Sequence, residues 1–513
     1  MSGFVENTQI FRWQRQRLHL APEGLVLEHR KLGSPRAQVV DFKRYEEVEE
    51  VKVERRWRRA VLVVRFPDSV WRIGGLPLGE AEWAAELIRE QQAIAYRFNI
   101  PEFREPQPFS FLVSRSQELA RERGFGLIEL LDLLAVQGVY HGASDIHFDP
   151  VRDGVRVRYR IDGVLQDVVT LPMDVHPFLL VRCKVLAGLA VHKFDAPQEG
   201  RMRVRTVDRD VDVRITILPT LHGEKVCLRI FDPSRRLLKV EQLGFRPEML
   251  QSYLRLLQAP QGMILLTGPA NSGKTTTIYA SLLHLHEHRK NLSSIVTVED
   301  PIEHDLQVIH QTQVKPEAGL TFAVGLRTLL RQDPEVIMVG EIRDPETAEI
   351  ATRAGLTGHL IFSTIHAPSA VGVFPRLIEL GVPPFLVASS VTAVLAERLV
   401  RRICPQCKEE APASQWPAEQ RERYGIGEDE TLLKGAGCEA CRGTGYAGRI
   451  ALFEMVRVDE PLREAIVRTA PVGELERIVR AQGVPSLKDD GVAKVREGIT
   501  TLDELDRVLG PEG

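Results

Sequence analysis

The pattern of apolar and polar positions changes along the chain and divides it into regions. Residues 1–98 begin with short stretches in which β-forming residues alternate with polar ones, such as "AVLVVRF" and "SVWRI", and end in a helical pattern over 78–97. Three prolines within 99–110 predict a linker, which we place over 99–125, and a helical stretch is expected within it at about 114–123. The first region is therefore expected to be a small β-rich module closed by one helix.

Two further regions follow this linker. Residues 126–235 combine helical stretches with β-rich ones, such as "GVRVRYRIDGVL", and predict an α+β domain. From 236 to 513 short apolar strands alternate with helical sequence, which is typical of an α/β fold with a parallel sheet covered on both faces. The order of elements in 1–98 resembles a pleckstrin-homology module, which implies a docking or regulatory role.

Charge and hydropathy exclude some classes of protein. The 513 residues include 67 basic and 70 acidic ones, a net charge of −3, which argues against a dedicated nucleic-acid binder. We find no apolar run of about eighteen residues that would span a membrane, and the first residues lack the apolar core of a secretory signal. We therefore expect a cytosolic protein, in which the six cysteines do not form a disulfide framework.

Residues 268–275, "GPANSGKT", carry the strongest chemical signal. This Gly-x-x-x-x-Gly-Lys-Thr pattern lies between an apolar strand, "MILLT", and a helical stretch, which is the context of a loop that binds nucleotide phosphates. Lys274 would contact the β- and γ-phosphates, Thr275 would ligate Mg²⁺, and Asn271 would tolerate a left-handed backbone. The residues expected to bind ATP are Gly268, Pro269, Ala270, Asn271, Ser272, Gly273, Lys274, Thr275 and Thr276.

The acidic group that would serve Mg²⁺ and the attacking water has two candidates. The strand "VIMVG" ends in Gly340, where such hydrolases usually have Asp, and Glu341 follows it. The stretch "VEDPIE" supplies Glu299, Asp300 and Glu303. An Asp before Pro can equally open a capped turn, so this second group has a purely structural alternative.

Four cysteines have the spacing of a metal site. Cys404-x-x-Cys407 and Cys438-x-x-Cys441 are two pairs that can close one tetrahedron, and four thiolates suit a structural Zn²⁺ with no open coordination position. A redox disulfide is the alternative, and the thioredoxin-like pattern that would favour it is absent from both stretches.

Several motifs in order resemble one family. "GPANSGKT", "VTVEDPIE", "GLRTLLRQDPEVIMVGEIRD" and "GLTGHLIFSTIHA" resemble the Walker A, Asp box, Walker B and His box of the secretion ATPase superfamily. "RLVRRICPQC" and "GCEACRGTGYAGRIALFEM" resemble the tetracysteine insert, at about 400–448, of its assembly branch, the ATPases of type II secretion and type IV pilus extension. The resemblance covers about 126–505 and implies a RecA-like P-loop ATPase domain after a PAS-like α+β domain.

The resemblance implies roles for individual residues in the ATPase domain. Glu341 and Glu299 would be the catalytic carboxylates, with Glu341 preferred for orienting the water. His366 would sense the γ-phosphate, with His359 as the second choice, and a packed histidine is the structural alternative. The segment after His366 reads "HAPSA" where the family usually has "HTND" or "HTNS".

The resemblance also implies a source of positive charge in the second domain. Arginines of that domain would reach the phosphates when it closes over the nucleotide, and they would stabilise the transferring charge. The matching positions are Arg201, Arg214 and Arg229. Each could instead be a surface charge on a strand.

The function implied is that of a hexameric motor. It would use ATP, Mg²⁺ and Zn²⁺, assemble pilin-like subunits through an inner-membrane platform protein, and be recruited by a cytoplasmic or membrane docking protein, with only peripheral membrane association. No nucleic-acid partner is expected. The alternatives are a RecA-like nucleic-acid translocase, a pilus retraction ATPase, which normally lacks the four cysteines, and a regulatory paralogue with weak hydrolysis. The motifs do not distinguish type II secretion, pilus extension and DNA uptake.

Overall fold

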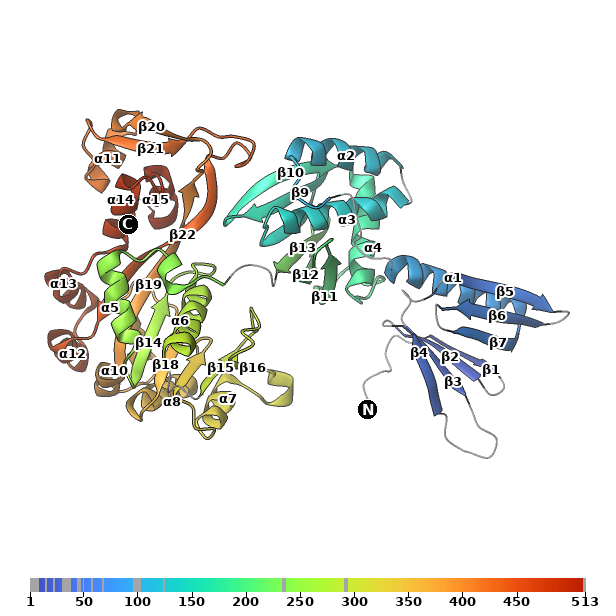
Figure 1. The fold of residues 1–513 in the computed structure, drawn as a ribbon, viewed down its shortest axis with the longest axis horizontal. Helices are drawn as coiled ribbons and strands as arrows, with labels where there is room; N and C mark the ends of the chain where they lie inside the picture. Colours follow the sequence, from blue (N-terminus) through green and yellow to red (C-terminus); the bar gives the residue numbers. More distant parts are fainter. Residues whose placement is uncertain are drawn as a thin grey trace. The chain divides into compact units, whose positions relative to one another are not determined.

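The computed structural model divides the chain into two compact units, residues 1–232 and 233–513. The described residues are 9–13, 16–21, 24–29, 38–43, 48, 50–56, 59–66, 69–95, 103–122, 125–232, 237–289 and 294–510. The first unit holds two separate apolar cores, and the second is built around one large sheet (Figure 1).

The first core belongs to two antiparallel sheets and a helix. Their strand orders are β1-β2-β3-β4 and β5-β6-β7, and Leu18, Leu62 and Ile88 pack together in the core that they share. The elements are β1 (Gln9–Trp13), β2 (Gln16–Ala21), β3 (Gly24–His29), β4 (Gln38–Lys43), β5 (Glu50–Arg56), β6 (Arg59–Arg65), β7 (Val70–Leu76) and α1 (Leu78–Ala95). The likeness to a pleckstrin-homology module stays a prediction.

The helix expected at about 114–123, within the stretch assigned to the linker, is present and begins earlier than the sequence indicated. Helix α2 (Phe109–Glu122) begins directly after Pro108, and it buries Leu112 and Leu119 in the second core. These two leucines are seven positions apart, so they share one face of the helix. The proline signal therefore holds only up to Pro108, and α2 belongs to the domain that follows.

The second core lies under a six-stranded antiparallel sheet of order β10-β9-β8-β13-β12-β11. Along β12, Val213 and Ile215 are buried, whereas Asp212 and Arg214 are exposed, so one face packs on helices and the other is polar. The elements are α3 (Phe125–Tyr140), β8 (Asp145–Val151), β9 (Gly154–Ile161), β10 (Val164–Leu171), α4 (His176–Leu186), β11 (Gln198–Arg205), β12 (Asp210–Thr220) and β13 (Gly223–Phe231). This is an α+β domain, and its likeness to PAS domains stays a prediction.

The second unit contains a seven-stranded mixed sheet of order β16-β15-β17-β18-β14-β19-β22. Neighbours from β16 to β19 are parallel, and only β22 is antiparallel to its neighbour β19. The strands are β14 (Gly262–Thr267), β15 (Ile295–Glu299), β16 (His310–Gln313), β17 (Val336–Val339), β18 (Leu360–Thr364), β19 (Val391–Ile403) and β22 (Tyr446–Arg457). The expected α/β class is confirmed, with one antiparallel edge.

Helices cover both faces of this sheet (Figure 1). Along β14, Met263 and Leu265 pack against one helical layer, and Ile264 and Leu266 against the other, which explains the uninterrupted apolar run of this strand. One layer has α5 (Pro247–Leu257) and α6 (Lys274–His288); the other has α7 (Phe322–Leu329), α8 (Pro345–Leu356), α9 (Val373–Glu379), α10 (Pro384–Ser390), α12 (Glu460–Val467) and α13 (Val472–Ala481).

An insert separates β19 from β22. It contains the two-stranded sheet of β20 (Lys408–Pro412) and β21 (Thr431–Gly435), with α11 (Ala418–Tyr424) between them. Its core is shared with the C-terminal helices α14 (Leu487–Arg496) and α15 (Leu502–Leu509). Among the residues that the structure describes, no helix has the length and apolar character needed to cross a membrane.

Candidate active site

The phosphate loop joins β14 to α6 and has the backbone shape that its sequence predicts. Asn271 has φ of 62° and Gly273 has φ of 105°, so the left-handed backbone expected at Asn271 is observed. Lys274 is the first residue of α6, and its Nζ donates to the carbonyl oxygens of Gly268 and Pro269 at 2.9 and 2.7 Å. The loop therefore presents a helix N-terminus and a cation together, which is the arrangement that binds phosphate.

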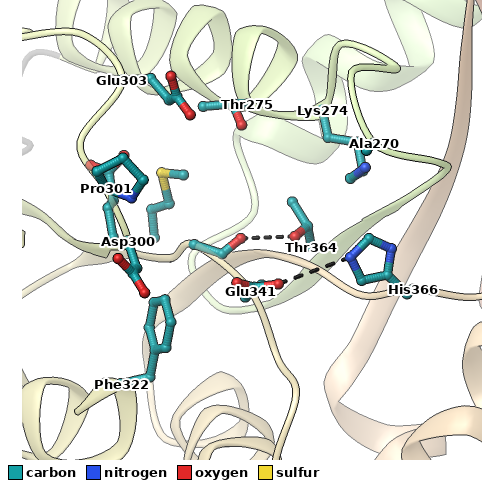
Figure 2. A pocket seen from close by; sticks show the side chains of 13 residues that line it. Ala270, Lys274, Thr275, Asp300, Pro301, Glu303, Phe322, Glu341, Thr364 and His366 are labelled. Carbon is teal, nitrogen blue, oxygen red and sulfur yellow. Dashed lines mark hydrogen bonds and ion pairs between the residues drawn. The ribbon is translucent and has the colours of Figure 1, made fainter. Parts of the chain in front are cut away.

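A pocket lies at the carboxyl edge of the parallel strands (Figure 2). Strands β15, β17, β18 and β14 are successive neighbours in the sheet, so the segments that follow them meet at this edge. Six of the residues predicted to bind ATP or to act in catalysis line the pocket: Ala270, Lys274, Thr275, Glu299, Glu341 and His366. Residues from four distant parts of the sequence thus form one site.

The side chain of Glu341 lies in the middle of this pocket, between the phosphate loop and the segment after β15. Its Oε2 lies 3.9 Å from Nε2 of His366 (Figure 2). The same oxygen lies 2.5 Å from Nε of Arg343. The side chain of Glu341 is only 14% exposed, whereas that of His366 is 59% exposed. Thr364 donates from Oγ1 to the carbonyl oxygen of Gly340 at 2.8 Å, which fixes the backbone before Glu341. The carboxylate of Glu341 is therefore largely buried and faces two exposed side chains, those of Arg343 and His366.

Glu299 is buried, and its carboxylate is occupied by protein donors. Tyr279 donates from its hydroxyl to Oε2, while Thr297 and Gln311 donate to Oε1 at 2.5 and 3.0 Å. Burial raises the pKa of Tyr279, which keeps its hydroxyl a donor. The same hydroxyl accepts from the backbone N–H of Glu303 at 3.3 Å. Glu299 therefore anchors the segment after β15, and Glu341 has the carboxylate with the freer oxygens.

Strand β18 separates the two candidate histidines. His359 precedes the strand, with Nδ1 3.1 Å from the carbonyl oxygen of Ala354, whereas His366 follows the strand and lines the pocket. In "HAPSA", where the sequence differs from the family, Ala367 makes two backbone hydrogen bonds with Thr267. Its carbonyl oxygen accepts from Oγ1 of Thr267 at 3.0 Å, and its N–H donates to the same Oγ1 at 3.1 Å. Because only backbone atoms of Ala367 make this contact, the changed side chain leaves His366 anchored beside β14.

The three predicted arginines form one row across the six-stranded sheet of the first unit. Arg201 of β11 lies opposite Arg214 of β12, which lies opposite Arg229 of β13. Arg229 is 3.0 Å from Asp145 of β8, the next residue in the row, and Arg214 is 2.6 Å from Glu199. Directly opposed residues share a sheet face, so the structure gathers three guanidinium groups on the polar face.

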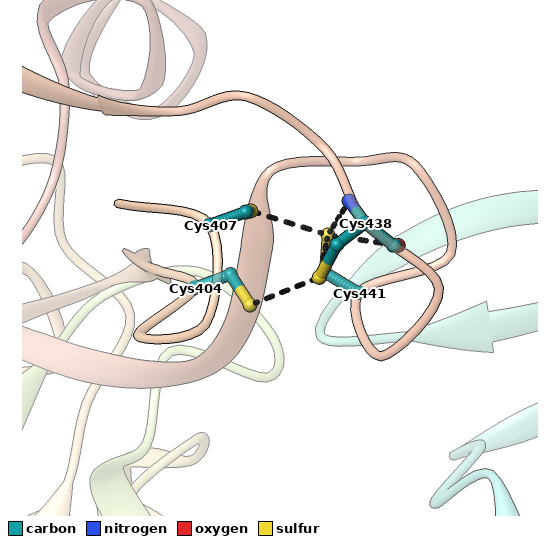
Figure 3. Close-up of side chains that lie close together, drawn as sticks. All are labelled: Cys404, Cys407, Cys438 and Cys441. Carbon is teal, nitrogen blue, oxygen red and sulfur yellow. Dashed lines mark hydrogen bonds between the residues drawn. The ribbon is translucent and has the colours of Figure 1, made fainter. Parts of the chain in front are cut away.

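The four cysteines of the insert converge as their spacing predicts (Figure 3). Their Sγ atoms all lie within 4.8 Å of one another, with 3.9 Å between Cys404 and Cys438, 3.8 Å between Cys407 and Cys441, and 3.7 Å between Cys438 and Cys441. Among the described residues this is the group with the geometry to hold a metal ion. Backbone N–H groups also donate to these sulfurs, such as that of Gly437 to Cys407 at 3.3 Å.

Some residues that contact Glu341 or Glu299 escaped the sequence analysis. Arg343 lies in the stretch that resembles the Walker B motif, but the sequence assigns it no role. Thr297 could have been found, because it lies two positions from Glu299 and strand residues with that spacing share a face. Tyr279 and Gln311 belong to other elements, and only the fold brings them to Glu299.

A phosphate loop at a helix N-terminus, with a carboxylate and a histidine on the neighbouring strand ends, defines the class of P-loop nucleotide hydrolases. Within that class the comparison with known proteins identifies the family. The family described as "Type II/IV secretion system protein" matches residues 122–507, and the chain belongs to it.

The relatives are secretion ATPases. The type II secretion system ATPase E of Vibrio cholerae serotype O1 is 44% identical over 384 residues, which is 74% of this chain and 75% of that protein. The type IV pilus assembly ATPase PilB of Thermus thermophilus is 44% identical over 367 residues, 71% of this chain and 41% of that protein. This chain is thus an ATPase of the secretion family, and the recognition from its motifs is confirmed.

A solved structure supports the fold. The X-ray structure of the Legionella pneumophila ATPase DotB aligns with a TM-score of 0.55 at 20% identity, over 73% of this chain and 94% of that one.

Proposed function

We propose that this chain is the cytoplasmic ATPase motor that powers the assembly of pilin-like subunits in type II secretion or type IV pilus biogenesis. One observation carries the chemistry: the pocket gathers Lys274, Thr275, Glu341 and His366 at the carboxyl edge of one sheet. The names of the relatives support the coupling, since both secretion and pilus-assembly ATPases are 44% identical to it.

Each residue of the pocket has a separate role in the binding or hydrolysis of ATP. The N-terminus of α6 and Lys274 bind the β- and γ-phosphates, and Thr275 is placed at the helix start where a hydroxyl would hold Mg²⁺. When bound, Mg²⁺ supplies positive charge to the terminal phosphates. Glu341 orients the attacking water with its Oε2. His366 turns from Glu341 to the γ-phosphate, because its exposed ring is free to move.

The arginine row supplies further positive charge. Arg201, Arg214 and Arg229 lie side by side on the polar face of the second domain. We assign to them the stabilisation of charge on the transferring phosphoryl group when that domain closes over the nucleotide. Preorganised cations are more effective there than in water, because a closed site excludes solvent.

The cysteine cluster fits a structural Zn²⁺. Zinc–sulfur bonds of about 2.3 Å in a tetrahedron place the sulfurs about 3.8 Å apart. The measured separations of 3.7, 3.8 and 3.9 Å agree with this geometry. With four thiolates around it, the ion would have no position for water, so its role is to stabilise the insert.

The motor acts as a ring, which we take to be a hexamer, at the cytoplasmic face of the inner membrane. It works on a platform protein of that membrane, and residues 1–98 dock it to a cytoplasmic or membrane partner. The four cysteines favour the assembly branch over a retraction motor.

The test is the steady-state ATPase activity of the purified full chain with and without single-stranded and duplex DNA. The proposal predicts slow hydrolysis that neither DNA changes. An ATPase activity that DNA raises many-fold would instead identify a nucleic-acid translocase. A chain that binds ATP without hydrolysing it, alone or with membrane partners, would be a regulatory paralogue.

A further inference from the structure

Glu397 is a buried acid on β19, the strand beside the one that leads into the phosphate loop. β19 pairs in parallel with β14, with Ala396 opposite Thr267, so Glu397 lies level with the start of the loop. On its other side it lies opposite Phe453 of β22. Its relative exposure is 1%, which is rare for glutamate unless the carboxyl group has a defined task or partner.

Both glycines of the phosphate loop touch this residue. A Cβ atom on Gly268 would lie 2.5 Å from the carbonyl oxygen of Glu397, and a Cβ atom on Gly273 would lie 2.1 Å from its Oε1. Both distances are too short for any real Cβ contact. The loop therefore rests on the backbone and the carboxyl group of Glu397, on the side away from the pocket.

Few groups around the carboxyl group of Glu397 could stabilise a negative charge on it. Among the described residues, neither Oε2 of Glu397 nor the buried Oγ of Ser272 has a hydrogen-bond partner. Burial raises the pKa of Glu397 to about 8, and the nearby Thr277 and Lys274 offset this only in part. The group is therefore mainly an uncharged acid at pH 7.

The other groups that face Glu397 come from two helices and its own strand. They are Lys274 of α6, Tyr253 of α5 and Arg398, whose Nη1 donates to the carbonyl oxygen of Glu397 at 3.1 Å. Burial lowers the pKa of Lys274, and Glu397 acts against that shift. Burial is also the main reason why the pKa of Tyr253 is raised. The charge on Glu397 therefore acts on Lys274, the cation that would bind phosphate.

We propose that Glu397 is a positioning residue for ATP: its carboxyl group supports Gly273 and thereby fixes Lys274 and the start of α6 at the phosphates. The proposal rests on ATP binding at the phosphate loop. As an uncharged acid, Glu397 supports the loop without repelling the nucleotide. As a carboxylate, it competes with phosphate for Lys274 and for the N-terminus of α6. ATP affinity should therefore be highest below the pKa and fall as the pH rises through it.

The experiment is the Kd for MgATP, with KM and kcat, measured on the full chain from about pH 6.5 to 9.5. In the parent, ionisation should raise Kd by up to about tenfold per pH unit above about pH 8. Glu397→Gln, which has the shape of the uncharged acid, should bind within about threefold of the parent at pH 7 and lose the alkaline rise. Glu397→Ala should weaken binding at least about tenfold across the range, with kcat less affected.

Glu454→Gln is the matched control. Glu454 is a half-buried glutamate of the neighbouring strand β22 whose pKa burial also raises, and it lies beside Ala396 rather than under the loop. This variant should keep the alkaline rise of the parent. The proposal is overturned if Glu397→Gln keeps that rise, or if a folded Glu397→Ala binds ATP like the parent. A parent that binds ATP with the expected pH profile but does not hydrolyse it would contradict the proposed function alone.

Discussion

Glu341 and His366 approach each other across the pocket, with 3.9 Å between Oε2 of the glutamate and Nε2 of the histidine. They follow β17 and β18, which are neighbours in the sheet (Figure 2). The phosphate loop follows β14, the next strand, so the pair and the loop line the same pocket. In our account Glu341 orients the water and His366 contacts the γ-phosphate.

His366→Ala should lower kcat for ATP hydrolysis about a hundredfold, because it removes a donor from the transferring phosphoryl group. The Kd for MgATP should change by less than about threefold, since the loop and Lys274 are intact. His359→Ala is the matched control: His359 lies before β18, outside the pocket, and its loss should leave kcat within about twofold. Equal effects of the two substitutions would contradict the assignment.

The arginine row can be tested within a single strand. Arg201→Ala should lower kcat at least about tenfold if, as proposed, the row supplies positive charge to the transferring phosphoryl group. Arg203 lies two residues further along β11, on the same face, and pairs with Asp212 at 3.1 Å outside the row. Arg203→Ala should therefore retain most of the activity. If both variants lost activity to the same extent, a general surface effect would replace the proposed role.

The sequence predicted the parts of the site that are local in the chain. The phosphate loop and the cysteine pairs have their chemistry within a few residues, so spacing alone was sufficient. Glu397 could not be found in this way, because "VLAERLV" reads as an ordinary strand, and only the sheet order places its one acid beneath the loop. The three arginines were predicted residue by residue from a resemblance, and the strand register places them opposite one another in one row.

Some features of the fold were also not predicted by the sequence pattern. The prolines of 99–110 predict a linker, but α2 begins directly after Pro108 and buries Leu112 and Leu119 in the second core. The hydrogen bond from Tyr279 to Glu299 joins a helix to a strand and has no signal in either segment.

Tyr279→Phe should destabilise the nucleotide-binding unit, because it leaves a buried carboxylate without one of its three donors. We expect a loss of about 2 kcal/mol, seen as a decrease in Tm of about 5 °C. In the control Tyr253→Phe, a neutral hydrogen bond to Ser281 of 2.7 Å is lost, and the expected cost is about 1 kcal/mol. Differential scanning calorimetry measures both. A smaller effect at Tyr279 than at Tyr253 would contradict the view that Glu299 anchors the segment after β15.

The zinc site proposed for the insert can be tested by measuring the metal content of the purified protein. The full chain should contain one zinc per protomer, and Cys407→Ser should lose it together with at least about 5 °C of Tm, since the ion stabilises the fold around it. Cys227→Ser is the control: this cysteine lies on β13, outside the cluster, and its variant should keep the zinc. Full zinc occupancy in Cys407→Ser would show that the four sulfurs do not form the site.

The most direct test of the account is a single-turnover experiment on Glu341→Gln. The variant should bind MgATP within about threefold of the parent and hydrolyse it at least about a hundredfold more slowly, because the water loses its carboxylate. Glu349→Gln, at an exposed glutamate of α8 that pairs with Arg353, serves as the control and should turn over like the parent. Bound ATP that persists only in Glu341→Gln would support the account. Turnover in Glu341→Gln at the rate of the parent would contradict it.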